Sequence, residues 1–418
     1  MVISRFPRSS ELWKFKKVSQ ISGKLFYLSD IDCFVNIFIN FVGSKPFIIM
    51  KKSLLLVSLL ILFCSFLQNS NKKPFILPEK DETLTLIFAG DIMGHSPQYK
   101  AAYSRKTNSF NYDICFKQVK KYIESADLAF ANLEVPIAGK PFSGYPNFSS
   151  PDALLDGLKY AGYDILQTAN NHALDREKFG LVRTIHQLDK RGLLHLGTYL
   201  DKNQRDSTYP LIIDKKGVRL AILNYTFGTN AHVVTEPNIV NYIDTLEIIN
   251  DIHKATELRA DFKIMTIHWG TEYELQANET QHKLAQFFVN HGIQLIIGSH
   301  PHVVQNAEIL YSKDSIPVTV YYSVGNSLSN QRNLNVNGGI MVKVDINART
   351  KSIKKTSYIP VYVHRGVLNK VYQYHLIPTI DFVGNPLQFP ISSSDSTSLV
   401  IFDKETRSRL SNVNLFQE

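Results

Sequence analysis

Gly298-Ser299-His300-Pro301-His302 follows the mostly apolar run 293–297 without a break. In an extended chain, side chains two residues apart point to the same side, so His300 and His302 are predicted to approach one point in space. Imidazole is the commonest metal ligand in proteins. A solvated loop at the end of a strand would show the same pair. Taken alone, the two histidines therefore leave a metal site and a solvated loop as alternatives.

Four further polar clusters also follow apolar runs. They occupy residues 90–95, 132–134, 169–175 and 268–270. With the histidine pair they supply carboxylate, amide and imidazole groups, a mixed oxygen and nitrogen set that suits Zn, Mn or Fe. We therefore predict a metal centre, and its candidate ligands are Asp91, Glu134, Asn171, His268, His300 and His302.

Six ligands exceed the needs of one tetrahedral ion. The surplus favours two ions bridged by a carboxylate, an arrangement that activates water and stabilises an oxyanion. His172, beside Asn171, is the candidate general acid, and a hydrogen-bonded loop histidine is the alternative. Asp175 either orients His172 or caps the helix predicted to follow it.

Three further residues are weaker candidates for the site. Asn326 lies in Tyr322-Ser323-Val324-Gly325-Asn326, which is typical of a strand ending in a glycine turn, and the residue is expected near the rim of the pocket. Glu272 follows His268 by four residues and either contacts substrate or is an exposed loop carboxylate. His95 is the third. Residues expected at the surface or in packing are His186, His253, His282, His291 and Cys115.

From residue 84 onward, short apolar runs alternate with longer amphipathic ones. This pattern predicts an α/β fold whose sheet is covered on both faces, with ligands at the carboxyl ends of strands. Ser150 is the expected cap of the second helix, with Pro151 at its first position. The predicted strands are 84–89, 128–132, 165–168, 193–196, 218–225, 262–268, 293–297 and 318–323, and the predicted helices lie near 113–125, 151–161, 177–191, 244–259 and 279–291.

The charge of the chain argues against a nucleic-acid-binding surface. The formal net charge is +9, and residues 1–52 hold nine Lys and Arg against three Asp and Glu. The remainder is therefore only mildly basic, too little for a platform that binds nucleic acid. Only one of the three cysteines lies beyond the apolar N-terminal region, so no disulfide framework is expected.

An export signal is predicted to begin at Met50. Lys51 and Lys52 precede the apolar stretch LLLVSLLILFCSFL at 54–67. A cleaved peptide, a membrane anchor and a lipoprotein signal remain alternatives, and each places the main domain outside the cytoplasm. The predicted organisation is an upstream extension of doubtful translation at 1–49, a signal or anchor at 50–68, a linker at 69–81, a main domain at 82–345, and at 346–418 an extension with a few strands and a loosely ordered polar tail.

The ordered motifs GD, NLE, ANNHALD, HWG, GSHPH and YSVGN resemble the CapA family of bacterial capsule synthesis proteins, which is linked to poly-γ-glutamate capsules. The resemblance spans about residues 84–345. It implies a relationship to calcineurin-like metallophosphoesterases and their fold, a double β-sandwich flanked by helices in α-β-β-α layers. The positions that match the motifs of that superfamily are Asp91, Asn171, His172, His268, His300 and His302.

Two departures from the phosphoesterase motifs bear on the number of ions. Asp-x-His is here Asp91-Ile92-Met93, so one ligand is missing, and His95 can replace it only if its loop folds back. The position of the bridging aspartate is also altered, with Glu134 as the nearest candidate. A site with one ion, or with altered chemistry, is therefore an alternative to two ions.

The resemblance implies a function at the cell envelope. We expect a protein that acts in the synthesis, export or processing of an anionic capsule polymer such as poly-γ-glutamate, with one or two divalent ions. Its expected partners are the polymer and membrane capsule-synthesis proteins, without nucleic acid. The alternatives are a non-catalytic component that binds or assembles the polymer, and a periplasmic metallophosphodiesterase.

Overall fold

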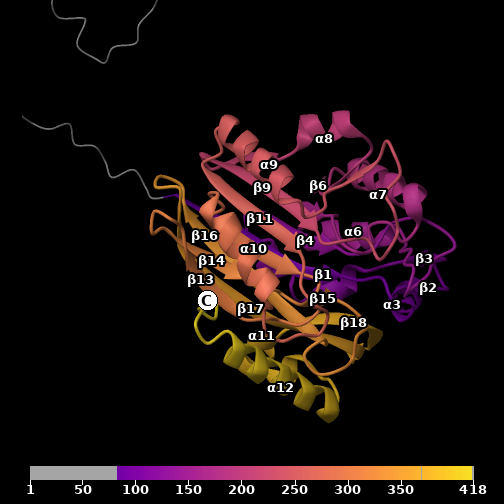
Figure 1. Cartoon of the computed structure of the whole chain (residues 1–418). Helices are drawn as coiled ribbons and strands as arrows, with labels where there is room; N and C mark the ends of the chain where they lie inside the picture. Colours follow the sequence, from indigo (N-terminus) through magenta and orange to yellow (C-terminus); the bar gives the residue numbers. More distant parts are fainter. Residues whose placement is uncertain (1–81, 369, 417–418) are drawn as a thin grey trace, which may run out of the picture. The chain divides into compact units, whose positions relative to one another are not determined.

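Two β-sheets pack face to face in the computed structural model, with helices on their outer faces (Figure 1). The structure describes residues 82–368 and 370–416. The upstream extension, the export signal and the linker predicted before residue 82 lie outside the described residues. Within the described part of the chain, no helix is long and apolar enough to cross a membrane.

The first sheet has eight strands in the order β18-β17-β16-β1-β4-β5-β6, with β15 also paired to β1. Its centre is parallel, because β1, β4, β5 and β6 run in one direction, whereas β16 is antiparallel to β1. The strands are β1 (Thr83–Ile92), β4 (Leu128–Leu133), β5 (Ile165–Gln167), β6 (Leu194–Leu196), β15 (Asn326–Leu328), β16 (Gly338–Asn347), β17 (Ser352–Leu368) and β18 (Val371–Pro378).

The second sheet has six strands in the order β13-β14-β12-β11-β9-β8. Its four central strands are parallel, and the two edge strands are antiparallel to their neighbours. The strands are β8 (Leu211–Lys215), β9 (Val218–Thr226), β11 (Phe262–His268), β12 (Leu295–Ser299), β13 (Ala307–Tyr311) and β14 (Pro317–Tyr321); two short ribbons pair β2 (Tyr103–Ser104) with β3 (Ser109–Phe110) and β7 (Thr198–Tyr199) with β10 (Ile239–Val240).

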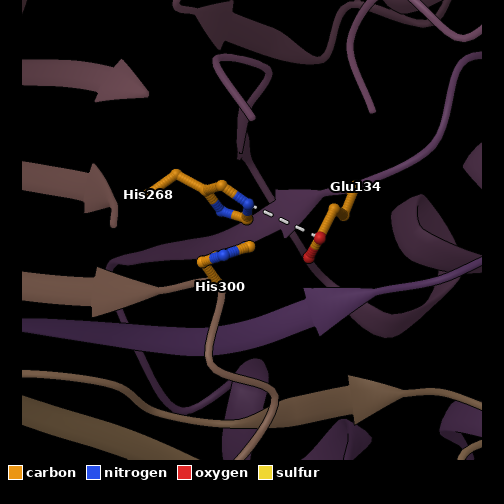
Figure 2. Close-up of side chains that lie close together, drawn as sticks. All are labelled: Glu134, His268 and His300. Carbon is orange, nitrogen blue, oxygen red and sulfur yellow. Dashed lines mark ion pairs between the residues drawn. The ribbon is translucent and has the colours of Figure 1, made fainter. Parts of the chain in front are cut away.

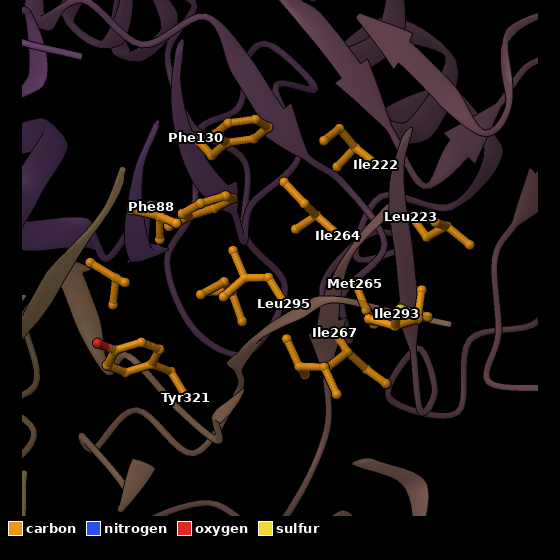
Figure 3. Packing of buried hydrophobic residues seen from close by; sticks show 14 of the residues in the cluster. Phe88, Phe130, Ile222, Leu223, Ile264, Met265, Ile267, Ile293, Leu295 and Tyr321 are labelled. Atoms are coloured by element: carbon orange, nitrogen blue, oxygen red, sulfur yellow. The ribbon is translucent and has the colours of Figure 1, made fainter. Parts of the chain in front are cut away.

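Alternate residues of β1 face different layers, as the period of a strand requires. Leu86 and Phe88 belong to the core between the two sheets, whereas Ile87 belongs to the core under the helices. Phe88 stacks on Phe130 of β4 with ring centroids 4.5 Å apart. Figure 3 shows this pair facing residues of the second sheet, among them Ile264.

Helices cover the outer face of each sheet. On the first sheet, Phe116, Leu155 and Leu188 pack in the cluster that contains Ile87, and on the second sheet α9 and α10 supply apolar residues to the main core. The α-β-β-α layers implied by the family resemblance are thus confirmed. The helices are α3 (Ser96–Ala102), α4 (Asp113–Phe116), α5 (Lys120–Ile123), α6 (Ala153–Ala161), α7 (Glu177–Arg191), α8 (Lys202–Thr208), α9 (Thr245–Glu257), α10 (Glu279–Asn290), α11 (Thr379–Gly384) and α12 (Ser393–Arg409), with a 3-10 turn at Pro386–Gln388.

Two predicted helices differ from those observed. The helix expected near 113–125 is two short helices, α4 and α5. The helix α6 begins at Ala153 after Asp152, so the expected cap Ser150 lies outside it and makes no capping bond. Pro151 instead supplies a carbonyl that accepts a hydrogen bond from the N–H of Leu154, which forms a turn ahead of the helix.

The C-terminal part is more ordered than the sequence suggested. The strands β17 and β18 extend the first sheet beyond β16, and they belong to the same compact unit as the rest of the described chain. The polar stretch expected as a loosely ordered tail begins α12, and Ser392 caps this helix by accepting a hydrogen bond from the N–H of Asp395 at 3.1 Å. Leu399 and Phe402 of α12 pack against Tyr362 of β17. The expectation of a loose tail was therefore wrong.

Candidate metal centre

Side chains from both sheets meet where the central parallel strands end. Asp91 lies near the end of β1, and Glu134 follows β4 directly. His268 is the last residue of β11, and His300 and His302 lie in the loop after β12. The first sheet therefore supplies the carboxylates and the second sheet supplies the imidazoles.

Glu134 belongs to two groups of ligand atoms. One group joins it to His268 and His300, and the other joins it to Asp91 and His302. Within each group the ligand atoms lie within 4.8 Å of one another, and all five residues are buried. Glu134 Oε1 lies 3.5 Å from His268 Nε2 and 3.8 Å from His302 Nε2. Figure 2 shows Glu134, His268 and His300 pointing toward one another.

Amide side chains connect the ligands. Asn171 Oδ1 lies 2.9 Å from His268 Nε2, as expected of a residue in the site. Asn132 was not singled out from the sequence, yet its Nδ2 donates to Asp91 Oδ1 at 2.8 Å and lies 3.3 Å from His268 Nδ1. Asn170 Nδ2 in turn donates to Asn132 Oδ1 at 3.2 Å. Asn132 lies two residues before Glu134 in the same polar cluster, and this position could have indicated that it belongs to the site.

The two histidines of the GSHPH stretch converge for a different reason from the predicted one. Both have left-handed backbone conformations, with φ of 100° at His300 and 58° at His302. Non-glycine residues rarely adopt this region, and such strain tends to be kept at functional sites. Both rings are buried, and His302 Nδ1 lies 3.1 Å from Asp91 Oδ2. The loop geometry, rather than the alternation of an extended strand, brings the rings into the site.

The residues at the centre fit a bound cation. Glu134 Oε1 and His300 Nδ1 are buried without a hydrogen-bond partner among the described residues. Burial, together with the nearby Asp91, raises the pKa of Glu134 well above its usual value. Burial lowers the pKa of His268 well below its usual value and that of His300 to about 3. A divalent cation would supply the missing partner and stabilise the buried carboxylates, and the mixed oxygen and nitrogen donors suit such an ion.

His172 is held by a carboxylate beside the ligands. Its Nδ1 lies 2.7 Å from Asp175 Oδ2, which also accepts a hydrogen bond from the N–H of Phe148 at 2.8 Å. The Phe148 ring meets the His172 ring edge-on at 4.7 Å. The N-cap of α7 is Arg176, without a side-chain capping bond, so Asp175 does not cap that helix. Asp175 therefore fixes the orientation of the His172 ring.

The three weaker candidates take different positions. His95 lies outside both ligand groups, where its Nδ1 is 3.0 Å from Gln98 Oε1, and burial lowers its pKa to about 4. Asn326 Nδ2 donates to the carbonyl of His302 at 3.2 Å and thus supports the histidine loop. Glu272 is exposed. Asn326 therefore stabilises the loop that carries His302. The loop that carries His95 does not fold back far enough to place its ring in either ligand group.

The histidines and the cysteine expected outside the site lie apart from the ligand groups. His186 and His253 are exposed, and His282 contacts the Tyr322 hydroxyl at 2.8 Å. His291 Nδ1 lies 2.7 Å from the carbonyl of Phe287. Cys115 is buried in the core under the helices, and burial raises the pKa of its thiol.

Sequence comparison places the chain in a known family. Residues 85–331, more than half of the chain, match the family of bacterial capsule synthesis proteins described as PGA_cap. The chain belongs to this family, and the match covers all the candidate ligands from Asp91 to His302.

Two relatives are similar over about two thirds of the chain. The capsule biosynthesis protein CapA of Bacillus anthracis is 26% identical over 287 residues, which cover 66% of this chain and 67% of the relative. The PGA biosynthesis protein CapA of Bacillus subtilis (strain 168) is 25% identical over 283 residues, 65% of this chain and 70% of the relative. Among solved structures, a phosphatase of Mycoplasma pneumoniae is similar with 17% identity and a TM-score of 0.41, covering 67% of this chain and 94% of the phosphatase.

Proposed function

We propose that this protein carries out a metal-dependent step in the synthesis, export or processing of an anionic capsule polymer such as poly-γ-glutamate. Membership of the capsule synthesis family supports the capsule role. The observation that carries the metal-dependent step is Glu134, a fully buried carboxylate that is shared by two ligand groups and has one oxygen without a hydrogen-bond partner among the described residues. Burying a carboxylate without a counter-charge costs free energy, so a purely structural role does not account for this residue.

The ligand groups would hold one or two ions of Zn, Mn or Fe, and Glu134 belongs to both groups. Asp91 and His302 would complete one site, and His268 and His300 the other, with Asn171 beside His268. Bound divalent ions would supply Lewis-acid polarisation and stabilise negative charge that develops during displacement at phosphorus or carbon.

The protein itself would supply proton transfer through His172. Asp175 accepts from Nδ1 and so fixes the tautomer, which leaves Nε2 as the atom that gives or takes a proton. The buried Phe148 packs against the ring and excludes water from one side of it. His172 would thus protonate the leaving group, with Asp175 as its positioning residue.

The family also supports a place at the cell envelope. We propose that the main domain works outside the cytoplasm, exported or anchored through the apolar segment predicted from Met50. Membrane capsule-synthesis proteins would be its partners there, and the anionic polymer its substrate.

The metal content of the purified chain tests the proposal. We expect one or two equivalents of metal per chain by elemental analysis after loading with Zn, Mn or Fe. The double substitution His300→Ala/His302→Ala should lose most of that metal, because it removes a ligand from each group. The matched control His186→Ala/His253→Ala removes two exposed histidines and should keep it. Metal content that is near zero in the native chain, or equal in the two double variants, would contradict the proposal.

A further inference from the structure

A cavity of about 980 Å³ lies outside the metal centre, between α3, the β2–β3 ribbon and the loop after Glu134. Its volume is at the upper end of the range typical of ligand-binding pockets. Aromatic rings form much of its wall: the ring of Phe142 lies 6.0 Å from that of Tyr99 and 5.3 Å from that of Phe110. Tyr103 of the ribbon also lines the cavity.

The charged residues of this cavity are all cationic. Lys100, Arg105 and Lys140 line it, and none of the residues that line it is acidic. All three cations are exposed. Among the described residues, no carboxylate oxygen lies within 4.0 Å of their charged nitrogen atoms, whereas many other Lys and Arg side chains of the protein are paired in this way. Three cations without counter-charges around one cavity favour an anionic ligand.

The helix α3 links residues that line the cavity to residues that pack beside the candidate metal centre. This helix follows directly after His95, whose ring meets Phe148 edge-on at 5.3 Å, and Phe148 in turn contacts His172. Tyr99, on the same helix, donates to the carbonyl of Phe142 at 3.4 Å. At 1.5 Å per residue, the seven residues of α3 extend roughly 10 Å. An extended strand of about four or more residues is longer than this helix, so one polymer chain would be long enough to contact both regions.

We propose that this cavity is a subsite for a strand of carboxylate-bearing polymer that extends from the metal centre. Lys100, Arg105 and Lys140 would bind successive carboxylates, and the aromatic wall would cover the apolar part of the strand. The proposal rests on the proposed function, because that function brings an anionic polymer to this face of the protein. It adds a second contact region, which holds the strand while another part of it lies at the centre.

Binding of fluorescently labelled poly-γ-glutamate to the full chain, measured by anisotropy with metal removed by chelation, tests the subsite. The variant Lys100→Gln/Arg105→Gln/Lys140→Gln should bind roughly tenfold or more weakly, which corresponds to about 1.4 kcal/mol. The matched control, Lys190→Gln/Lys313→Gln/Lys404→Gln, removes the same charge from exposed positions elsewhere and should bind like the native chain. Poly-γ-glutamate with methyl-esterified carboxylates should not bind.

Each outcome decides between the two proposals. If both triple variants bind the polymer equally weakly, net charge explains the loss of affinity and the subsite is contradicted. Unchanged affinity in the first variant, or tight binding of the esterified polymer, would contradict it as well. Metal content measured on each preparation before chelation reports separately on the centre. A chain that holds no metal, yet binds the polymer through these three cations, would contradict the proposed function and support the subsite.

Discussion

Two buried histidines outside the candidate metal centre lie where burial lowers their pKa values. His364 and His375 lie opposite each other on β17 and β18, with ring centroids 5.9 Å apart. Burial lowers the pKa of His375 to about 4, and its neighbour His364 contributes in the same direction. The charged groups that face the pair are Asp395 on α12, 3.7 Å from His364 Nδ1, and Arg332.

We expect the free energy of unfolding to fall as the pH falls from about 6.5 toward 4. In that interval the unfolded chain binds a proton at His375 and the folded chain does not, so acid favours unfolding, whereas above pH 6.5 both states are neutral there. The slope from one such histidine is at most about 1.4 kcal/mol per pH unit. His375→Gln should reduce the slope in urea denaturation measured across this range. The exposed control His253→Gln should not, and an unchanged slope in His375→Gln would refute the assignment.

At this scale the sequence predicted which candidate ligands lie close together, because polar residues at the ends of parallel strands share one edge of the sheet. Asp91, Glu134 and His268 meet for that reason. Their hydrogen-bonded partner Asn132 was missed, since an asparagine at a strand end is equally typical of a turn. The left-handed backbone of His300 was also missed, because it depends on how the loop packs rather than on local preference.

The element least visible in the sequence is α12. Its buried positions are Leu399, Phe402, Asp403 and Thr406, so the buried face carries only two large apolar residues and shows no clear amphipathic period. Asp403 accepts a hydrogen bond from the Thr379 hydroxyl at 2.5 Å, which makes burial of the carboxylate tolerable. The polar composition therefore suggested a loose tail where tertiary contacts form a helix.

The strand β17 falls in the region where the sequence predicted a few strands, but its bounds were not predicted, for the opposite reason. Its second half is buried on both faces, with Ile359 and Val361 in the core under the helices and Tyr362 against α12. Strands covered on both faces lose the alternation that marks a half-exposed strand. The pattern therefore weakened where the sheet in fact continues.

If α12 is an integral part of the fold, then Phe402→Ala should lower the free energy of unfolding by about 3–4 kcal/mol, the usual cost of deleting a buried aromatic side chain. Chemical denaturation followed by circular dichroism would measure this. Val400→Ala, on the exposed side of the same helix, should change it by less than about 0.5 kcal/mol. Similar small losses in the two variants would mean that the helix contributes little to stability.

At the scale of the whole molecule, the candidate metal centre draws on both sheets. Asp91 and Glu134 come from the first sheet, and the three histidines of the candidate ligand groups come from the second. The family resemblance implied the layers and the sequence pattern predicted the strand ends, but neither gave the order of strands within a sheet. The place of β15 beside β1, for example, depends on contacts between residues far apart in the chain.

Because an ion would bind only the folded arrangement of both sheets, metal removal should lower the stability of the whole protein. At a free metal concentration about one hundredfold above the dissociation constant, the stabilisation is about 2.7 kcal/mol. Thermal unfolding with metal and with chelator would show a higher Tm with metal. The His300→Ala/His302→Ala variant should show no such difference, and a metal-dependent shift that persists in it would place the bound ion elsewhere.

The hydrogen bond between Asp91 and His302 also constrains when the centre can form. These residues are 211 positions apart in the sequence, so no short stretch of the chain holds a complete set of ligands. Closing so long a loop costs conformational entropy, and the contacts that offset this cost come from both sheets. A chain that crosses a membrane unfolded would therefore carry no finished centre with it. The metals available in the compartment where the chain completes its folding would therefore determine which ion it binds.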